Sequence, residues 1–281
     1  MTGAPATTLR CALLGVLLGS NAALAADKAP LWELGLGVGA VSFPDYRGSD
    51  ERQTYLLPTP YFIYRGDFLR SDRKGLRGVF FDSERLELNL SVSGSVPVDS
   101  DGNKARRGMP DLHPTVEFGP SVDLSLWKSA DGRRELDLRL PVRWAFRLGG
   151  RPRDIGLVFS PRVNLDVADP AGFEGWRLGM LAGPIFTDRR NNAYYYDVAE
   201  PYATAERPAY ASSGGYAGSQ FVVALSKRYP GYWVGFFSRY DSLGGAVFDD
   251  SPLVRSRHMW AGGVAISWII GESSTLVDDE E

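Results

Sequence analysis

Apolar and polar side chains alternate along most of the chain between residues 32 and 270. In residues 135–148 every even position is apolar, whereas the odd positions hold Glu135, Asp137, Arg139, Arg143 and Arg147 together with a proline and an alanine. Successive side chains of a β-strand point to opposite faces, so this segment predicts a strand with one apolar and one charged face. A helix would scatter the same charges around its circumference, so the pattern favours a strand.

The predicted strands are long. Alternation recurs in residues 86–98, 116–127, 155–167, 176–186, 217–225 and 260–270. Strands of globular proteins average about 5–6 residues, whereas a tilted strand that crosses a bilayer needs about 9–11. No stretch approaches the roughly 20 consecutive apolar residues of a membrane-spanning helix. The pattern therefore predicts an all-β chain that forms a transmembrane up-and-down antiparallel β-barrel.

Aromatic residues gather at the ends of these strands, on the apolar face. An up-and-down trace places one group on one side of the membrane, namely Trp32, Trp176, Tyr232 and Trp268. It places a second group on the other side, namely Trp144, Phe146, Phe186, Tyr240 and Trp260. Two aromatic belts are typical of barrels whose rings lie at the lipid headgroups.

Connection lengths give the number of strands. Short turns at residues 82–85, 128–134, 168–174 and 229–231 alternate with connections at 99–113, 149–153, 187–214 and 242–256. Short turns face the periplasm in outer-membrane barrels. Keeping this order requires residues 66–81 to form two short strands that turn at residues 72–75. The count is then 12 strands with both termini in the periplasm, and a merged arrangement of ten strands is the alternative.

The N-terminus resembles a secretion signal. Arg10 precedes an apolar run at residues 11–19, and Ala23 and Ala25 place small residues where a signal peptidase cleaves. We predict a signal peptide at residues 1–25, a barrel at 26–270 and an acidic periplasmic tail at 271–281. The predicted location is the outer membrane of a Gram-negative cell. The membrane location and the strand pattern both predict that the barrel contacts the lipid bilayer, which is therefore one of its partners.

Charge and cysteine content exclude several function classes. The chain has 31 basic and 34 acidic residues, and this balance argues against nucleic-acid binding. Its only cysteine, Cys11, lies in the predicted signal peptide, so the mature chain has neither a disulfide nor a thiolate metal site. The two histidines, His113 and His258, lie in different outward connections without a nucleophile and an orienting group. We therefore predict no catalytic site, cofactor or metal, and a protein that is not an enzyme.

Charged residues on the inward face are the first candidate site. Pairing the strands outward from their turns puts Asp123 near Arg139, Arg139 near Arg162, and Asp166 near Arg177. Such charges either fill a narrow lumen and stabilise it, or line the constriction of a small-solute channel. For about 12 strands, filling is the favoured interpretation.

The longest connection, residues 187–214, is the second candidate. It carries five tyrosines among small polar residues, namely Tyr194, Tyr195, Tyr196, Tyr202 and Tyr210. Exposed tyrosines are common at recognition surfaces. The same residues could instead fold into the mouth of the barrel, and the sequence leaves both alternatives open.

Motifs along the mature chain resemble the MipA/OmpV family of MltA-interacting outer-membrane proteins. The C-terminal third contains Arg-Tyr-Asp-Ser-Leu at 239–243, Trp-Ala-Gly-Gly-Val at 260–264, and the most specific block, Asp250, Ser251, Pro252 and Leu253. The N-terminal third contains Pro-Asp-Tyr-Arg-Gly-Ser at 44–49, followed by Pro58 and Pro60. One departure is the end of the chain, where Trp268 is followed by an acidic tail instead of closing the barrel as a terminal aromatic.

The resemblance implies a scaffold that bridges a lytic transglycosylase and a peptidoglycan synthase. A small-solute channel and a surface adhesin are the alternatives that the family and the sequence leave open.

Overall fold

The computed structural model describes residues 28–66, 68–72, 75–83 and 85–278. Strands form a closed antiparallel barrel, in which β14 pairs with β2. Its strands are β2 (Trp32–Pro44), β3 (Arg52–Arg65), β4 (Leu69–Asp72), β5 (Gly75–Asp82), β6 (Leu86–Ser95), β7 (Thr115–Lys128), β8 (Arg134–Arg147), β9 (Arg153–Phe159), β10 (Arg162–Ala168), β11 (Trp176–Thr187), β12 (Gly215–Tyr229), β13 (Tyr232–Ser242) and β14 (His258–Glu272). The connections hold one helix, α1 (Arg189–Tyr196), and two short 3₁₀ turns, η1 (Pro170–Gly172) and η2 (Glu200–Tyr202).

The wall of the barrel has 12 strand positions, as the sequence predicts. Strands β9 and β10 share one position, because both pair with β8 on one side and with β11 on the other. The predicted single strand at 155–167 is therefore interrupted at Ser160 and Pro161, where the proline lacks an N–H for the ladder. The predicted division of residues 66–81 is confirmed, since β4 pairs with β5 and Asp72 lies opposite Gly75.

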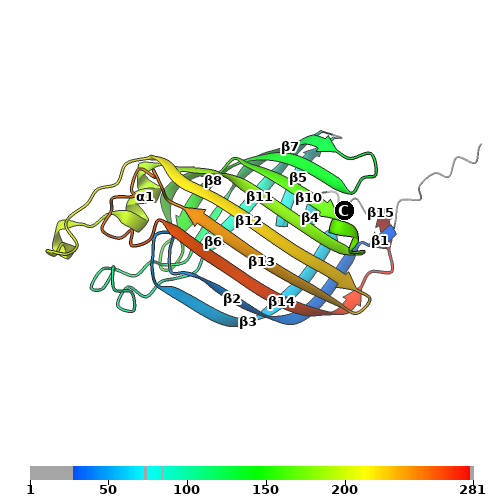
Figure 1. The fold of residues 1–281 in the computed structure, drawn as a ribbon, viewed down its shortest axis with the longest axis horizontal. Helices are drawn as coiled ribbons and strands as arrows, with labels where there is room; N and C mark the ends of the chain where they lie inside the picture. Colours follow the sequence, from blue (N-terminus) through cyan, green and yellow to red (C-terminus); the bar gives the residue numbers. More distant parts are fainter. Residues whose placement is uncertain (1–27, 67, 73–74, 84, 279–281) are drawn as a thin grey trace, which may run out of the picture.

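Short turns lie at one end of the barrel, and the longer connections with α1 lie at the other (Figure 1). Two short strands, β1 (Lys28–Pro30) and β15 (Leu276–Asp278), pair at the end that carries the short turns. Part of the predicted tail at 271–281 is thus paired, and β14 continues to Glu272. The predicted signal peptide and residues 279–281 lie outside the described residues.

Side chains alternate between an apolar outer face and a polar lumen. On β2, Leu34, Leu36 and Val38 are exposed on the outside, whereas Glu33 is buried in the lumen. Aromatic side chains meet across strands near both ends, with Tyr232 opposite Trp268 and Tyr240 opposite Trp260. Within the described residues, no helix is long and apolar enough to cross a membrane.

Candidate functional site

The middle of the lumen contains an arginine surrounded by carboxylates, which we call the Arg139 cluster. Register places Arg139 on β8 opposite both Asp123 on β7 and Arg162 on β10. The Arg139 guanidinium lies 3.7 Å from Asp123 Oδ2, 3.5 Å from Asp137 Oδ2 and 3.8 Å from Asp166 Oδ2. These separations are those of ion pairs without close hydrogen bonds. Because the arginine is only 6% exposed, its charge depends on these three carboxylates.

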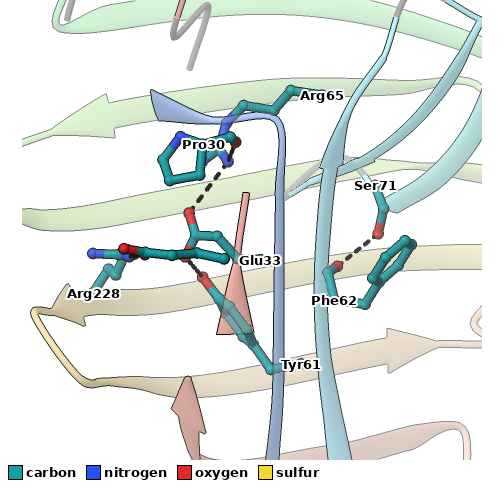
Figure 2. Close-up of polar contacts among 8 residues, drawn as sticks. Pro30, Glu33, Tyr61, Phe62, Arg65, Ser71 and Arg228 are labelled. Carbon is teal, nitrogen blue, oxygen red and sulfur yellow. Dashed lines mark hydrogen bonds and ion pairs between the residues drawn. The ribbon is translucent and has the colours of Figure 1, made fainter. Parts of the chain in front are cut away.

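A second set of contacts, the Glu33 cluster, crosses the lumen near the end that carries the short turns (Figure 2). Glu33 is 1% exposed and accepts hydrogen bonds from Arg65 Nη1 at 3.2 Å and Arg228 Nε at 2.7 Å. The Tyr61 hydroxyl donates to the same carboxylate at 3.3 Å. Arg228 comes from β12, which is separated from β2 by β13 and β14, so the contact spans part of the lumen instead of joining neighbours.

Two further groups of buried ion pairs lie in the outer half of the lumen. Arg143 of β8 donates to Glu117 Oε2 of β7 at 3.0 Å and to the hydroxyls of Ser91 on β6 and Ser160 between β9 and β10. In the second group, Asp241 is contacted by Arg47 Nε at 3.1 Å and Arg239 Nε at 2.8 Å. The polar lumen face is therefore largely occupied by opposite charges held close together.

The outer end of the barrel is covered by a loop cap, which we define as residues 45–51, 96–114, 188–214 and 243–257. Its core is apolar and comprises Tyr46, Val98, Leu112, Tyr196, Leu243, Ala246 and Phe248, packed on Ala217 and Met259 of the wall. The rings of Tyr196 and Phe248 stack with centroids 3.7 Å apart. Burial in this core raises the pKa of Tyr196. The cap therefore packs as a small hydrophobic core of its own.

Polar contacts fasten the cap segments to one another. The guanidinium of Arg106 donates to the Tyr195 carbonyl at 3.0 Å and the Pro110 carbonyl at 3.1 Å, and it lies over the Tyr46 ring. Burial lowers the pKa of Arg106. Asn103 donates to Asp45 Oδ2 at 2.8 Å, so the segment 96–114 is held to the segment 45–51 as well.

The Asp-Ser-Pro-Leu block lies inside this cap. Ser251 is buried and its hydroxyl donates to the Tyr196 carbonyl at 2.8 Å. Leu253 is fully buried, and its carbonyl accepts from the Tyr46 hydroxyl at 2.7 Å. Asp250 is exposed and accepts from the Tyr210 hydroxyl at 2.5 Å, while Pro252 is half-buried. The block connects three of the four cap segments.

Tyrosines of the longest connection divide between the two alternatives that the sequence left open. Tyr194, Tyr195 and Tyr196 lie on α1 and fold into the mouth, where the Tyr194 hydroxyl donates to the His113 carbonyl at 3.0 Å. Tyr210 also packs against the cap core, whereas Tyr202 is half-buried on η2. Helix α1 begins at a regular N-cap, because the Asp188 side chain accepts from the Asn191 N–H.

The other candidate residues are placed as follows. Arg177 on β11 lies opposite Ala168, two residues beyond Asp166 in register, and the ion pair of Asp166 is with Arg139. His258 Nδ1 lies 2.7 Å from the Tyr240 hydroxyl, and the Ser256 hydroxyl donates to the His258 carbonyl instead of facing its ring. Among the described residues, no group of three His, Cys, Asp or Glu could hold a metal ion.

A cavity of about 460 Å³ lies beneath the loop cap. Its lining mixes the arginines Arg143, Arg162 and Arg239 with apolar side chains that include Phe43, Leu181 and Phe237. Sequence reasoning missed this cavity, the Glu33 cluster and the Asp241 ion pairs. Each of these joins residues about 190 or more positions apart in sequence, as the separations of 194 and 195 residues for Arg47–Asp241 and Glu33–Arg228 show. Only barrel closure brings such residues together.

Comparisons with known proteins agree with this architecture. The family model described as MltA-interacting protein MipA matches residues 36–270. The outer membrane protein OmpV of Vibrio cholerae serotype O1 is 26% identical, over 74% of this chain and 76% of its own length. The outer membrane protein Omp26La of Vibrio anguillarum is 25% identical, over 82% of this chain and 84% of its own length.

Solved structures resemble the chain at the level of the barrel. The toluene transporter TodX of Pseudomonas putida gives a TM-score of 0.35 at 10% identity, over 86% of this chain and 90% of that chain. Outer membrane phospholipase A from Escherichia coli gives 0.32 at 10% identity, over 86% and 94%. Scores this low carry no argument about activity. The family match covers most of the chain, and its named relatives are outer-membrane proteins: the chain is an outer-membrane β-barrel that belongs to the MipA family of MltA-interacting proteins.

Proposed function

We propose that this barrel is a scaffold that holds peptidoglycan-remodelling enzymes at the inner face of the outer membrane, and that it is not itself an enzyme. The observation that carries the proposal is that polar and apolar contacts occupy the lumen at both ends. The loop cap packs around Tyr196 and Phe248 at the outer end, and the Glu33 cluster crosses the lumen at the periplasmic end. A lumen filled in this way serves stability better than transport.

The periplasmic end offers the surface for the partners. Strands β1 and β15 form a two-stranded sheet there, beside the short turns. The family is named for interaction with MltA, a lytic transglycosylase, and this name is the support for the first partner. A peptidoglycan synthase as the second partner rests on the family resemblance of the motifs alone.

An adhesin role has less support from the geometry. Four of the five loop tyrosines, all except Tyr202, lie in the cap core or pack against it. Hot spots of recognition surfaces are clustered, well-packed aromatic and arginine side chains. Tyr202, which is half-buried, fits that description poorly.

Binding to purified enzymes tests the scaffold. The mature barrel, immobilised in nonionic detergent, is exposed to the lytic transglycosylase of the same organism, to a bifunctional peptidoglycan synthase, and to both together. We expect both enzymes to be retained at once, and retention to fall when residues 273–281 are deleted, because β15 then no longer pairs with β1.

The matched control alters the opposite end of the barrel. Tyr202→Ala together with Tyr210→Ala changes the outer loop and should leave retention of both enzymes unchanged. Failure of the wild-type barrel to retain either enzyme would contradict the scaffold proposal. Loss of retention in the outer-loop variant, with the tail deletion unaffected, would move the binding surface to the outside.

A further inference from the structure

The barrel wall has an incomplete stretch between β3 and β6. The β4–β5 hairpin that separates them is short, and in the described part of the chain β4 pairs with β3 only at Tyr64 and Arg65. On its other side, β5 pairs with β6 no further outward than Leu90. Among the described residues, no strand pairs with β3 from Arg52 to Ile63 on the side away from β2, or with β6 from Ser91 to Ser95 on the side away from β7.

Exposure on both faces marks the same stretch. In a closed barrel wall one face of each strand is covered by the lumen contents. On β3, however, the consecutive residues Leu56, Leu57 and Pro58 are all exposed, and Leu56 and Leu57 are exposed to 75% and 45%. On β6 and just beyond it, all six residues at 92–97 are exposed. Even- and odd-numbered side chains are thus both exposed on β3 and on β6, the two rims of the incomplete stretch.

The sequence of β3 suits an edge without a partner. Arg65 donates its N–H to Leu31, toward β2, so the backbone groups of even-numbered β3 residues point toward the incomplete stretch. Two of these residues, Pro58 and Pro60, have no N–H to leave unpaired. Phe62 is the next even-numbered residue of β3, and its carbonyl accepts a hydrogen bond from the Ser71 hydroxyl at 2.9 Å (Figure 2). Within sheets proline occurs mainly at edges, at the first residue of a strand and at bulges, and β3 is the strand of this barrel with two prolines on one edge.

The cavity beneath the loop cap reaches this stretch. Its lining includes Ser93, Gly94 and Ser95 on the β6 rim and Phe43 at the outer end of β2. Of the described residues, none from β3, β4 or β5 lines it, although these strands occupy the intervening wall positions. On this side the residues that line the cavity therefore end at β2 and β6, the strands on either side of β3, β4 and β5.

One cation that lines the cavity has no counter-ion among the described residues. Arg143 and Arg239 are paired with Glu117 and Asp241, respectively. Arg162 also lines the cavity, but within the described part of the chain no carboxylate lies in ion-pair distance of it. Its Nε is buried without a hydrogen-bond partner. A guanidinium in this state is suited to a carboxylate or phosphate ligand.

We propose that the cavity opens sideways into the outer leaflet between β3 and β6 and binds a single-chain anionic amphiphile, with its anionic group at Arg162 and its alkyl chain extending through the opening. The volume falls within the range of small-molecule pockets, and its apolar lining by Phe43, Leu181 and Phe237 suits an alkyl chain. This inference goes beyond the scaffold role and does not depend on it.

Single cysteines test the opening. A chain that begins at Ala26 has no cysteine of its own, so Ser93→Cys places one thiol on the β6 rim of the cavity. In liposomes, lipid-soluble pyrenyl maleimide should label it at least about tenfold faster than it labels Ser121→Cys, because a buried thiol in a complete wall must wait for local opening. Ser121 is the matched control, since it faces the lumen from the neighbouring β7 and is 4% exposed. Equal rates, or labelling of Ser93→Cys only by a membrane-impermeant sulfonated maleimide, would overturn the lateral opening.

Native mass spectrometry tests the ligand class, with oleate as the probe and oleylamine as the cationic control. Wild type should retain oleate in preference to oleylamine, and Arg162→Gln should weaken oleate binding roughly tenfold to a hundredfold through loss of a charge-assisted hydrogen bond. Arg133→Gln, an exposed arginine in a periplasmic turn, should bind oleate like wild type. Equal binding of oleate by the Arg162 variant, or equal retention of oleylamine by wild type, would overturn the anionic site. Neither result would bear on enzyme retention at the periplasmic end.

Discussion

Two stretches of the same barrel wall, β7–β8 and β3–β6, differ in how far their strand ladder extends. Strands β7 and β8 pair from Thr115 opposite Arg147 to Lys128 opposite Glu135, interrupted only at residues 119–120 and at a bulge between Ser125 and Trp127. Their lumen residues Asp137 and Arg139 are buried. The long β3 strand has a complete ladder on the β2 side, but among the described residues it pairs with β4 only at Tyr64 and Arg65.

The comparison shows that alternation along a strand is not sufficient to cover one of its faces. A strand presents two faces whatever its neighbours do, but a lumen face is covered only where strands on both sides continue at the same height. Between β7 and β8 this condition allows buried ion pairs. Between β3 and β6 it fails, and both rims stay exposed.

The largest expected effect on stability comes from removing Arg139, the central cation of the β7–β8 stretch. Arg139→Ala leaves Asp123, Asp137 and Asp166 without the cation between them and should destabilise the barrel by about 3–5 kcal/mol. The measurement is urea unfolding of the protein in detergent. Arg133→Ala removes an arginine whose side chain is 60% exposed and whose ion pair to Asp169 spans 3.8 Å, and should cost no more than about 1 kcal/mol. A similar loss of unfolding free energy in the two variants would show that the Arg139 cluster is solvated.

The second effect concerns the lipid face of the same strand. Leu140→Arg should cost about 2–4 kcal/mol if the residue lies at the bilayer midplane, because a cation is then placed against lipid chains. The same unfolding assay in liposomes measures it. Leu140→Met keeps the position apolar at similar volume and should cost less than about 1.5 kcal/mol. Indistinguishable unfolding curves for the two variants would contradict the assignment of this face to the bilayer.

A third, smaller effect is expected in the loop cap. Ser251→Ala removes the donor to the buried Tyr196 carbonyl and should cost about 1–3 kcal/mol. Limited proteolysis of residues 188–214 in intact cells reports the loosened cap. Ser256→Ala, at an exposed position, should change stability by no more than about 0.5 kcal/mol. Protease resistance equal to wild type in the Ser251 variant would remove the Asp-Ser-Pro-Leu block from the cap's stabilising contacts.

The smallest effect is a pH dependence of the cap. Burial raises the pKa of Tyr194 to about 12, above the ordinary value of 10.0. A raised pKa means that its contribution to stability is complete below pH 10 and is lost as the pH rises toward 12. Proteolysis of the cap should therefore accelerate within this window and not below it, and less so in Tyr194→Phe, which has no proton to lose. Acceleration at neutral pH would point to a different group.

Most of the fold could be predicted from local patterns in the sequence. Alternation and turn lengths predicted 12 strands, the division of residues 66–81, and the placement of Asp123 opposite Arg139, because each depends on neighbours joined by a short turn. The family resemblance of the Asp250–Leu253 block was visible as a motif. Its packing against Tyr196 and Tyr46 was not, since these contacts come from loops far apart in sequence.

The rest depends on the closure of the barrel. The contact between Glu33 and Arg228 exists only because β14 pairs with β2, and no local pattern indicates which lumen residues then face each other. The incomplete wall stretch did leave a signal in the sequence. Pro58 and Pro60 remove two N–H groups from the same edge of β3, although single prolines also stand in paired strands such as β7 and β8. In the sequence they were visible only as part of a family motif.

Planar bilayer recordings of the purified wild-type barrel test most directly the central claim, which is that contacts close the lumen. With the loop cap packed at the outer end and the Glu33 cluster across the periplasmic end, we expect insertion without steady conductance at any applied voltage. Arg139→Ala should lower the melting temperature and still leave anion permeability near zero. Steady anion-selective conductance in the wild type, with a reversal potential that shifts toward cations in Arg139→Ala, would contradict the closed barrel and establish a channel lined by that arginine.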